Sequence, residues 1–178
     1  VQRLKGDDCW PVMDAGSWSK GGCDPALFEA CLARTQTLAQ PETYSHRYPT
    51  PEQMREWVEE PVAYRIEYVD GTKATMLLMN GLVGDFTFAA RIKGQASPLS
   101  TLFYLPPVPN VMYSAELMAK AEATFMTGKS PGPIERTLLT TGLVEACVQS
   151  ANTEQARTET PHLDVAYQVT SESLFAED

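Results

Sequence analysis

The feature that most constrains the fold is a pair of β-rich segments, residues 62–69 and 73–80, joined through Asp70-Gly71. Asp-Gly supplies the positive φ angles of a type I′ turn, whose twist matches that of the flanking strands. Two more segments of this kind, residues 86–92 and 99–105, follow after short connections that contain glycine. Sequential strands with short connections form an antiparallel meander, which excludes repeated parallel βαβ units.

Helix start signals lie on both sides of this meander. Asp24-Pro25 and Thr50-Pro51 each combine a side chain that accepts a hydrogen bond from a free backbone amide with a proline, which suits the first helical turn. Ser114 offers a similar start farther along, and Gly128 lies where a glycine would end that helix. The sequence therefore predicts four helices, at residues 25–37, 51–60, 114–127 and 134–150.

Shorter segments complete the expected fold. Residues 1–4 and 163–169 are strand candidates, residues 9–22 an irregular loop, and residues 171–178 an acidic tail. This order of elements is typical of an α+β fold, with a mostly antiparallel, open β-sheet and helices packed on one face. We find no internal repeat and no linker, so we expect a single domain over residues 1–170.

Composition limits the partners of the chain. The 178 residues include 14 Lys and Arg against 23 Asp and Glu, which gives a net charge of −9. This excess of negative charge repels a phosphate backbone, and no local basic face offsets it, so we expect no nucleic-acid partner. No stretch approaches the roughly 20 apolar residues of a membrane span, so we expect no membrane partner.

Cysteine and histidine usage indicates no metal site. The chain contains four cysteines and two histidines, which are Cys9, Cys23, Cys31, Cys147, His46 and His162. None of these has zinc-ligand spacing, and Cys31 and Cys147 fit small buried apolar positions. A reduced, cytoplasmic setting is favoured, although Cys9 and Cys23 could pair in an oxidising compartment.

Two segments carry a family resemblance. One is the hairpin Ile66-Glu67-Tyr68-Val69-Asp70-Gly71, and the other is the helix sequence Arg136-Thr137-Leu138-Leu139-Thr140-Thr141-Gly142. In this order they resemble the carboxy-terminal half of the Gfo/Idh/MocA group of NAD(P)-dependent oxidoreductases. The resemblance implies an α+β domain that lines the substrate pocket and forms the oligomer interface through its sheet, beside a separate Rossmann domain.

The resemblance also implies where the cofactor binds. The glycine-rich fingerprint and the Glu-Lys-Pro catalytic segment of the group have no match in this chain. We therefore expect no cofactor on this chain alone and NAD(P) on the Rossmann domain of a parent protein, and no catalytic residue of the group can be assigned to this chain. The substrate would be a small molecule, with sugar-like compounds as one candidate class. The chain begins at Val1 rather than Met, so we expect a fragment or a processed product.

Four residues are candidates for substrate binding. Asn80 and Asp85 flank a turn at a strand end, where site residues often lie, although glycines there also fit a simple turn. Arg136 and Thr137 follow a proline at a helix start, where the helix dipole disfavours a cation. Arg136 could therefore hold a substrate carboxylate, form a structural ion pair with Glu135 or Asp85, or donate to a backbone carbonyl. The Thr137 hydroxyl could donate to a ligand or to a helix carbonyl.

Two other functions fit the same sequence. The first is a stand-alone, non-catalytic binding or scaffold protein derived from such a domain. The second is a small enzyme that uses Asp85 or Glu67 as an acid or base, which requires a carboxyl group with a raised pKa in an apolar pocket.

Overall fold

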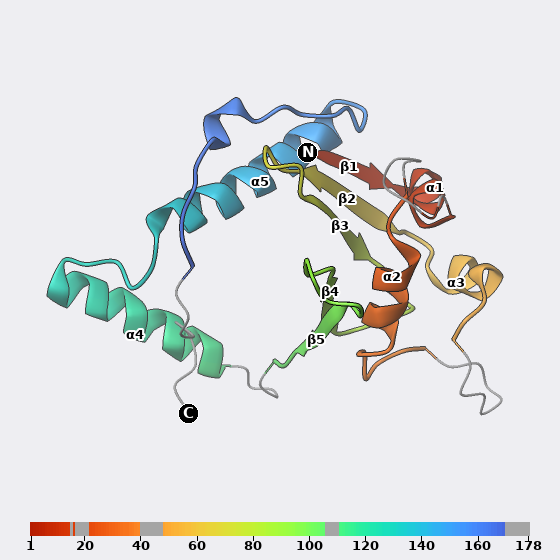
Figure 1. Ribbon diagram of the computed structural model, residues 1–178, viewed down its shortest axis with the longest axis horizontal. Helices are drawn as coiled ribbons and strands as arrows, with labels where there is room; N and C mark the ends of the chain where they lie inside the picture. Colours follow the sequence, from red (N-terminus) through yellow and green to blue (C-terminus); the bar gives the residue numbers. More distant parts are fainter. Residues whose placement is uncertain (15, 17–21, 40–47, 106–110, 170–178) are drawn as a thin grey trace. The chain divides into compact units, whose positions relative to one another are not determined.

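The computed structural model of the chain describes residues 1–14, 16, 22–39, 48–105 and 111–169 (Figure 1). The chain packs into two compact units. The first comprises Val1–Tyr104 and Cys147–Thr158, and the second comprises Leu105–Ala146 and Glu159–Asp178. The expectation of one domain over residues 1–170 stays a prediction, because compactness alone does not define a folding unit. The acidic tail at residues 171–178 lies outside the described residues.

The first unit contains two antiparallel sheets. In one, β1 (Gln2–Lys5), β2 (Val62–Glu67) and β3 (Lys73–Leu78) pair in the order β1-β2-β3. In the other, β4 (Phe86–Ala90) pairs with β5 (Leu99–Phe103). The α+β class and the antiparallel pairing are confirmed, whereas the predicted single meander is divided after β3.

The turn between β2 and β3 differs from the predicted type I′ turn. Within residues 68–72 only Gly71 has a positive φ angle, of 84°. The Gly71 amide donates to the Tyr68 carbonyl at 3.0 Å, and the Tyr68 amide donates to the Thr72 carbonyl at 2.9 Å. This is the three-residue hairpin loop with glycine in the left-handed position, which also matches the strand twist.

A tight turn separates β3 from β4. The amides of Leu82 and Val83 both donate to the Met79 carbonyl, at 2.9 and 3.1 Å. Gly81 in this turn has a φ angle of 97°, and a Cβ placed on it would lie 2.1 Å from the Trp57 carbonyl oxygen. The turn thus packs directly against another backbone segment, which ends the first sheet at β3.

Two helices begin where the sequence predicts them. In α2 (Pro25–Leu32) the Asp24 carboxylate accepts the Ala26 amide at 2.9 Å. In α3 (Pro51–Trp57) Thr50 and Gln53 form a reciprocal capping box. Helix α2 ends at Leu32, five residues before the predicted end at Thr37.

The predicted loop at residues 9–22 is partly helical. A 3₁₀ turn, η1 (Gly6–Cys9), leads into the short helix α1 (Trp10–Asp14). Trp10 is only 8% exposed and Val12 only 2%. Burial of these two side chains explains helical structure in a segment that has no regular apolar period.

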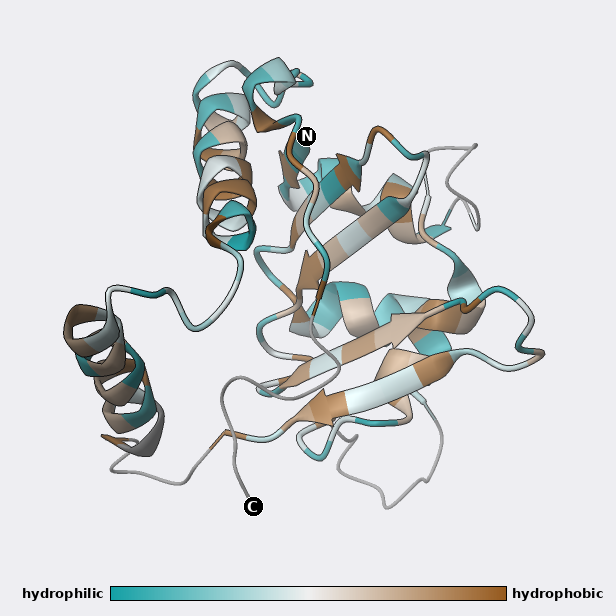
Figure 2. Cartoon of the chain, turned by 60° about the vertical axis from the view of Figure 1, so that its left-hand side comes forward, coloured by the Kyte–Doolittle hydropathy of each residue, from teal (hydrophilic) through white to brown (hydrophobic). Residues whose placement is uncertain are grey.

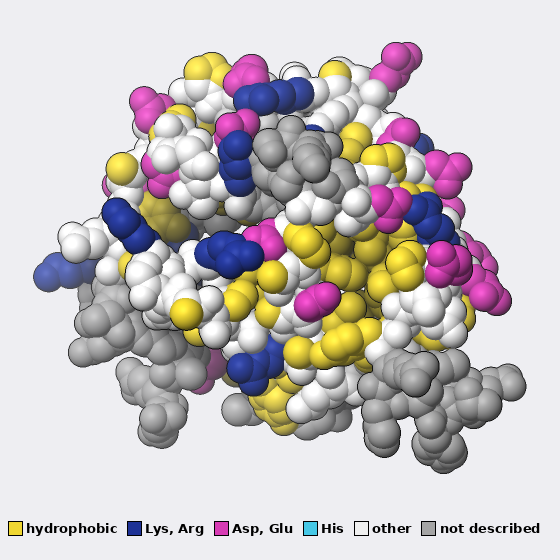
Figure 3. All heavy atoms as spheres, turned by 45° about the vertical axis from the view of Figure 1, so that its right-hand side comes forward, with side chains coloured by type: hydrophobic (Ala, Val, Ile, Leu, Met, Phe, Trp, Pro, Cys, Tyr) yellow, Lys and Arg dark blue, Asp and Glu magenta, His cyan; other side chains and the backbone are white. Residues whose placement is uncertain are grey.

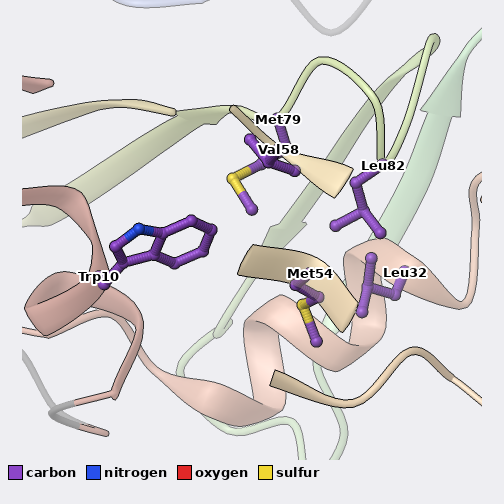
Figure 4. Packing of buried hydrophobic residues seen from close by; sticks show 6 residues of the cluster. All are labelled: Trp10, Leu32, Met54, Val58, Met79 and Leu82. Atoms are coloured by element: carbon purple, nitrogen blue, oxygen red, sulfur yellow. The ribbon is translucent and has the colours of Figure 1, made fainter. Parts of the chain in front are cut away.

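The core of the first unit lies between these helices and the sheets. One buried cluster consists of Trp10, Leu32, Met54, Val58, Met79 and Leu82 (Figure 4). The indole of Trp10 points toward Met54 and Val58 in that view. A second, smaller cluster contains Cys9, Val12 and Ala63.

The outer edge of β1 is also occupied. The Arg3 amide donates to the Ser150 hydroxyl at 2.9 Å, and the Lys5 amide donates to the Gln155 side-chain carbonyl at 2.6 Å. Ser150 itself is fully buried and donates to the Ala156 carbonyl at 2.7 Å. The end of α5 and the residues that follow it thereby accept the outward amides of Arg3 and Lys5.

The second unit is mainly helical. It contains α4 (Val111–Thr127) and most of α5 (Ile134–Asn152), close to the predicted bounds, and η3 (Pro161–Leu163). Gly142 of α5 lies against Leu163, because a Cβ on Gly142 would lie 2.3 Å from a Leu163 methyl group. The predicted strand at residues 163–169 is wrong. The amides of Leu163 and Val165 instead make local bonds to Thr160 and Leu163 carbonyls.

Candidate functional site

The four predicted substrate-binding residues divide between the two units. Asn80 is exposed in the turn after β3, and Asp85 is half-buried just before β4. Arg136 and Thr137 are both exposed in the first turn of α5.

Asp85 has a clear structural partner set. Its carboxylate accepts the Thr35 hydroxyl at 2.5 Å and the Gln36 amide at 2.7 Å. Next to it, the Thr37 hydroxyl accepts the Gly84 amide at 2.8 Å. Asp85 thus holds the segment after α2 against the start of β4. Because Thr35 and Gln36 bond to Asp85, this segment does not continue the helix.

Electrostatics at Asp85 do not favour an acid or base role. Desolvation at this position raises its pKa, but hydrogen bonds from Thr35, Gln36 and Thr37 outweigh that effect and hold the pKa below its ordinary value. A carboxyl group that protonates near pH 7 needs the opposite shift.

The start of α5 shows local helix bonding. The Thr140 hydroxyl donates to the carbonyls of Arg136 and Thr137, at 3.0 and 3.2 Å. Such bonds back to the preceding turn are the common role of threonine within helices. A substrate contact by Arg136, Thr137 or Asn80 stays a prediction.

The surface that distinguishes the first unit is apolar and lies on β4 and β5. The register places Phe86 opposite Phe103 and Ala90 opposite Leu99, so these side chains share one sheet face with Phe88. On that face Phe86 is 56% exposed, Phe103 53% and Leu99 49%.

The opposite face of this pair is covered. Thr87 and Leu102 are half-buried there, and α2 packs against both strands. The Arg34 guanidinium of the α2 end donates to the Ser100 hydroxyl at 2.9 Å. The covered and open faces of β4 and β5 thus differ sharply.

The first sheet repeats this asymmetry. Ala63 and Leu77 are paired and face the core, whereas Met76 and Leu78 lie on the other face. Met76 is 51% exposed and Leu78 37%, so β3 is covered on one face only. The hydropathy colouring shows apolar residues along the strands of both sheets (Figure 2). We use the name open sheet faces for six exposed residues, which are Met76, Leu78, Phe86, Phe88, Leu99 and Phe103.

A separate cavity of about 160 Å³ lies between α1, α2 and α3. Its lining residues are Trp10, Met13, Asp14, Phe28, Pro51, Met54 and Arg55. Arg55 forms an ion pair with Asp14, and its guanidinium carbon lies 4.8 Å from the centre of the Trp10 ring. On the side of the first unit that carries α1 and α3, hydrophobic side chains gather beside acidic ones (Figure 3). Sequence reasoning missed this cavity, because its walls come from three separate segments.

The four cysteines, all within the described residues, show no feature of a reactive thiol. Cys9, Cys23, Cys31 and Cys147 are free thiols, and burial raises the pKa of each. The alternative Cys9–Cys23 disulfide is therefore not formed, and Cys31 and Cys147 are half-buried rather than buried. Across the described part of the chain, no three His, Cys, Asp or Glu side chains gather as a metal site. His46 lies outside the described residues.

Within the described ranges, no helix has the length and apolar character needed to cross a bilayer. Comparison of the sequence and structure with protein-family models, curated proteins and solved structures gives no match.

Proposed function

We propose that this chain is the substrate-binding and oligomerisation domain of a cytoplasmic NAD(P)-dependent oxidoreductase of the Gfo/Idh/MocA type. Support from the sequence comes from the hairpin at residues 66–71 and the helix sequence at residues 136–142. In this proposal a Rossmann domain of the parent protein binds the nicotinamide cofactor and supplies the catalytic residues. The chain itself contributes contacts to a small-molecule substrate.

The observation that carries the oligomerisation part is the pair of open sheet faces. Three phenylalanines on β4 and β5, namely Phe86, Phe88 and Phe103, are each between 45% and 56% exposed. Contiguous exposed apolar side chains of this size mark interaction surfaces in folded proteins. Fully burying a large apolar side chain contributes about 1.5–3 kcal/mol, so each of these half-exposed rings would contribute about half of that when two copies associate.

The experiment is a measurement of molar mass in solution by sedimentation or light scattering, over a range of chain concentrations. We expect the wild-type chain to associate and Phe88→Lys to shift the population to monomer, because a charge on the open face cannot be buried without a partner. Val69→Lys is the matched control, since Val69 is apolar and 94% exposed but lies in the hairpin loop. It should leave association unchanged.

Two outcomes would contradict this proposal. A wild-type chain that is monomeric at every concentration would show that the open sheet faces do not join copies of the chain. These faces would then bind a different protein, as expected of a stand-alone binding protein. Saturable binding of NADH or NADPH to this chain alone, measured by calorimetry, would contradict the proposed division of labour between domains.

A further inference from the structure

The cavity between α1, α2 and α3 has no role in the proposed function, and its chemistry defines a ligand. We propose that it binds a small, uncharged aromatic compound that carries one hydroxyl group, a phenol-type ligand. The inference rests on the size of the cavity, on its walls and on the charges at its mouth.

The volume of the cavity matches one aromatic ring. The cavity measures about 160 Å³. An apolar protein cavity of about 150 Å³ accommodates one benzene molecule. A single six-membered ring with a small substituent therefore fits within it.

The walls favour an aromatic ring over an aliphatic one. Trp10 and Phe28 offer aromatic surfaces, and Met13 and Met54 offer polarisable thioethers, which make favourable contacts with ring edges. Trp10 is 8% exposed and Met54 9%, and both belong to the core cluster. These two walls are consequently fixed before a ligand enters.

The mouth favours an uncharged polar group. The Asp14 carboxylate accepts from the Arg55 guanidinium, and the two side chains are 52% and 42% exposed. Together they present one positive and one negative group with no net charge. A carboxylate on the ligand would be attracted by Arg55 but repelled by Asp14, and an ammonium group the reverse, so neither gains a net attraction. A hydroxyl group can donate to the carboxylate and accept from the guanidinium, so it matches both.

The direct test is a titration of the full chain, labelled with ¹³C at the methionine methyl groups, with p-cresol. We expect saturable shifts of the Met13 and Met54 signals, whereas Met76 on β3, which is 51% exposed and outside the cavity lining, stays fixed. Toluene, benzoate and benzylamine serve as comparison probes. Because hydrogen bonds to charged groups are the stronger ones, p-cresol should bind about tenfold more tightly than each of them.

Two charge variants test the mouth. Asp14→Asn leaves a net positive mouth, so benzoate should gain about tenfold relative to p-cresol. Arg55→Gln leaves a net negative mouth, so benzylamine should gain instead. Asp70→Asn, an equal change of charge in the β2–β3 hairpin loop, should leave the order of the four probes unchanged.

The proposal is overturned if Met13 and Met54 show no saturable shift with p-cresol, or if the four probes bind equally well. An unchanged order of probes in Asp14→Asn also overturns it, and this conservative variant decides the question if Arg55→Gln does not fold. None of these outcomes bears on the oligomer measurement, because the open sheet faces contain no residue of the cavity.

Discussion

The ring of Phe88 lies 6.5 Å from the ring of Phe103, tilted by 56°, across the β4–β5 pair. This spacing falls within the range in which aromatic rings attract each other beyond simple burial. Both side chains nevertheless remain about half exposed, at 45% and 53%. The pair therefore supports its two strands only in part and leaves apolar surface exposed.

Phe103→Ala should lower the free energy of unfolding of the monomer by about 1–2 kcal/mol, through lost burial and the lost ring pair. Urea unfolding at low chain concentration measures this change. Phe125→Ala is the control, because Phe125 is 88% exposed on α4. Its effect should stay within about 0.5 kcal/mol. Equal losses in the two variants would contradict the role given to the pair.

Gly81→Ala should destabilise the first unit by at least about 3 kcal/mol, because the new methyl group meets a backbone carbonyl at a left-handed position. The Trp57 carbonyl oxygen lies 2.1 Å from the added atom. Gly71→Ala is the matched control, since Gly71 has a similar φ angle of 84° but open space around it. The control should cost only about 1–2 kcal/mol, which isolates the steric part in thermal or urea unfolding.

Asp85 should make stability depend on pH in the acidic range. Its folded-state pKa lies below the ordinary value, so its contribution is fully present above about pH 4 and is lost as the pH falls through the folded-state pKa. Asp85→Asn should cost about 1 kcal/mol at pH 6 and progressively less below pH 4. Urea unfolding at several pH values checks this. A difference between the wild type and the variant that grows on acidification would contradict it.

Asp24 forms both a helix cap and an ion pair, and two variants separate their contributions to the free energy of unfolding. Its carboxylate caps α2 and also accepts from Arg91 at 2.5 Å, although the Arg91 side chain is 58% exposed. Asp24→Asn keeps the cap and loses the ion pair, so it should cost less than about 0.5 kcal/mol. Asp24→Ala loses both and should cost about 1 kcal/mol or more. Equal costs would assign the stabilisation to the ion pair.

Local signals in the sequence predicted the local features of the fold. The caps at Asp24 and Thr50, the β2–β3 hairpin and the glycine end of α4 at Gly128 depend on neighbouring residues, and the structure contains all four. Gly128, with a φ angle of 68°, closes α4 through a bond from its amide to the Thr124 carbonyl.

Features that depend on distant contacts were not predicted. The break between the two sheets requires the backbone of Trp57 beside Gly81, and helix α1 requires the burial of Trp10. The cavity forms where Trp10, Phe28 and Met54, which come from three separate segments, lie together. The apolar periodicity within any one segment does not predict this arrangement. Asp85 was singled out by its place at a strand end, but its partners Thr35 and Gln36 lie some fifty residues away in sequence.

The bonds that Ser150 and Gln155 make to β1 have a consequence for how copies of this chain can assemble. The Arg3 and Lys5 amides, which would otherwise template a neighbouring strand, are already engaged. A strand of another molecule therefore cannot pair with β1 at that border. Such pairing is one route toward fibrils. Any copy of the chain that meets this border must do so through side chains rather than through a main-chain ladder.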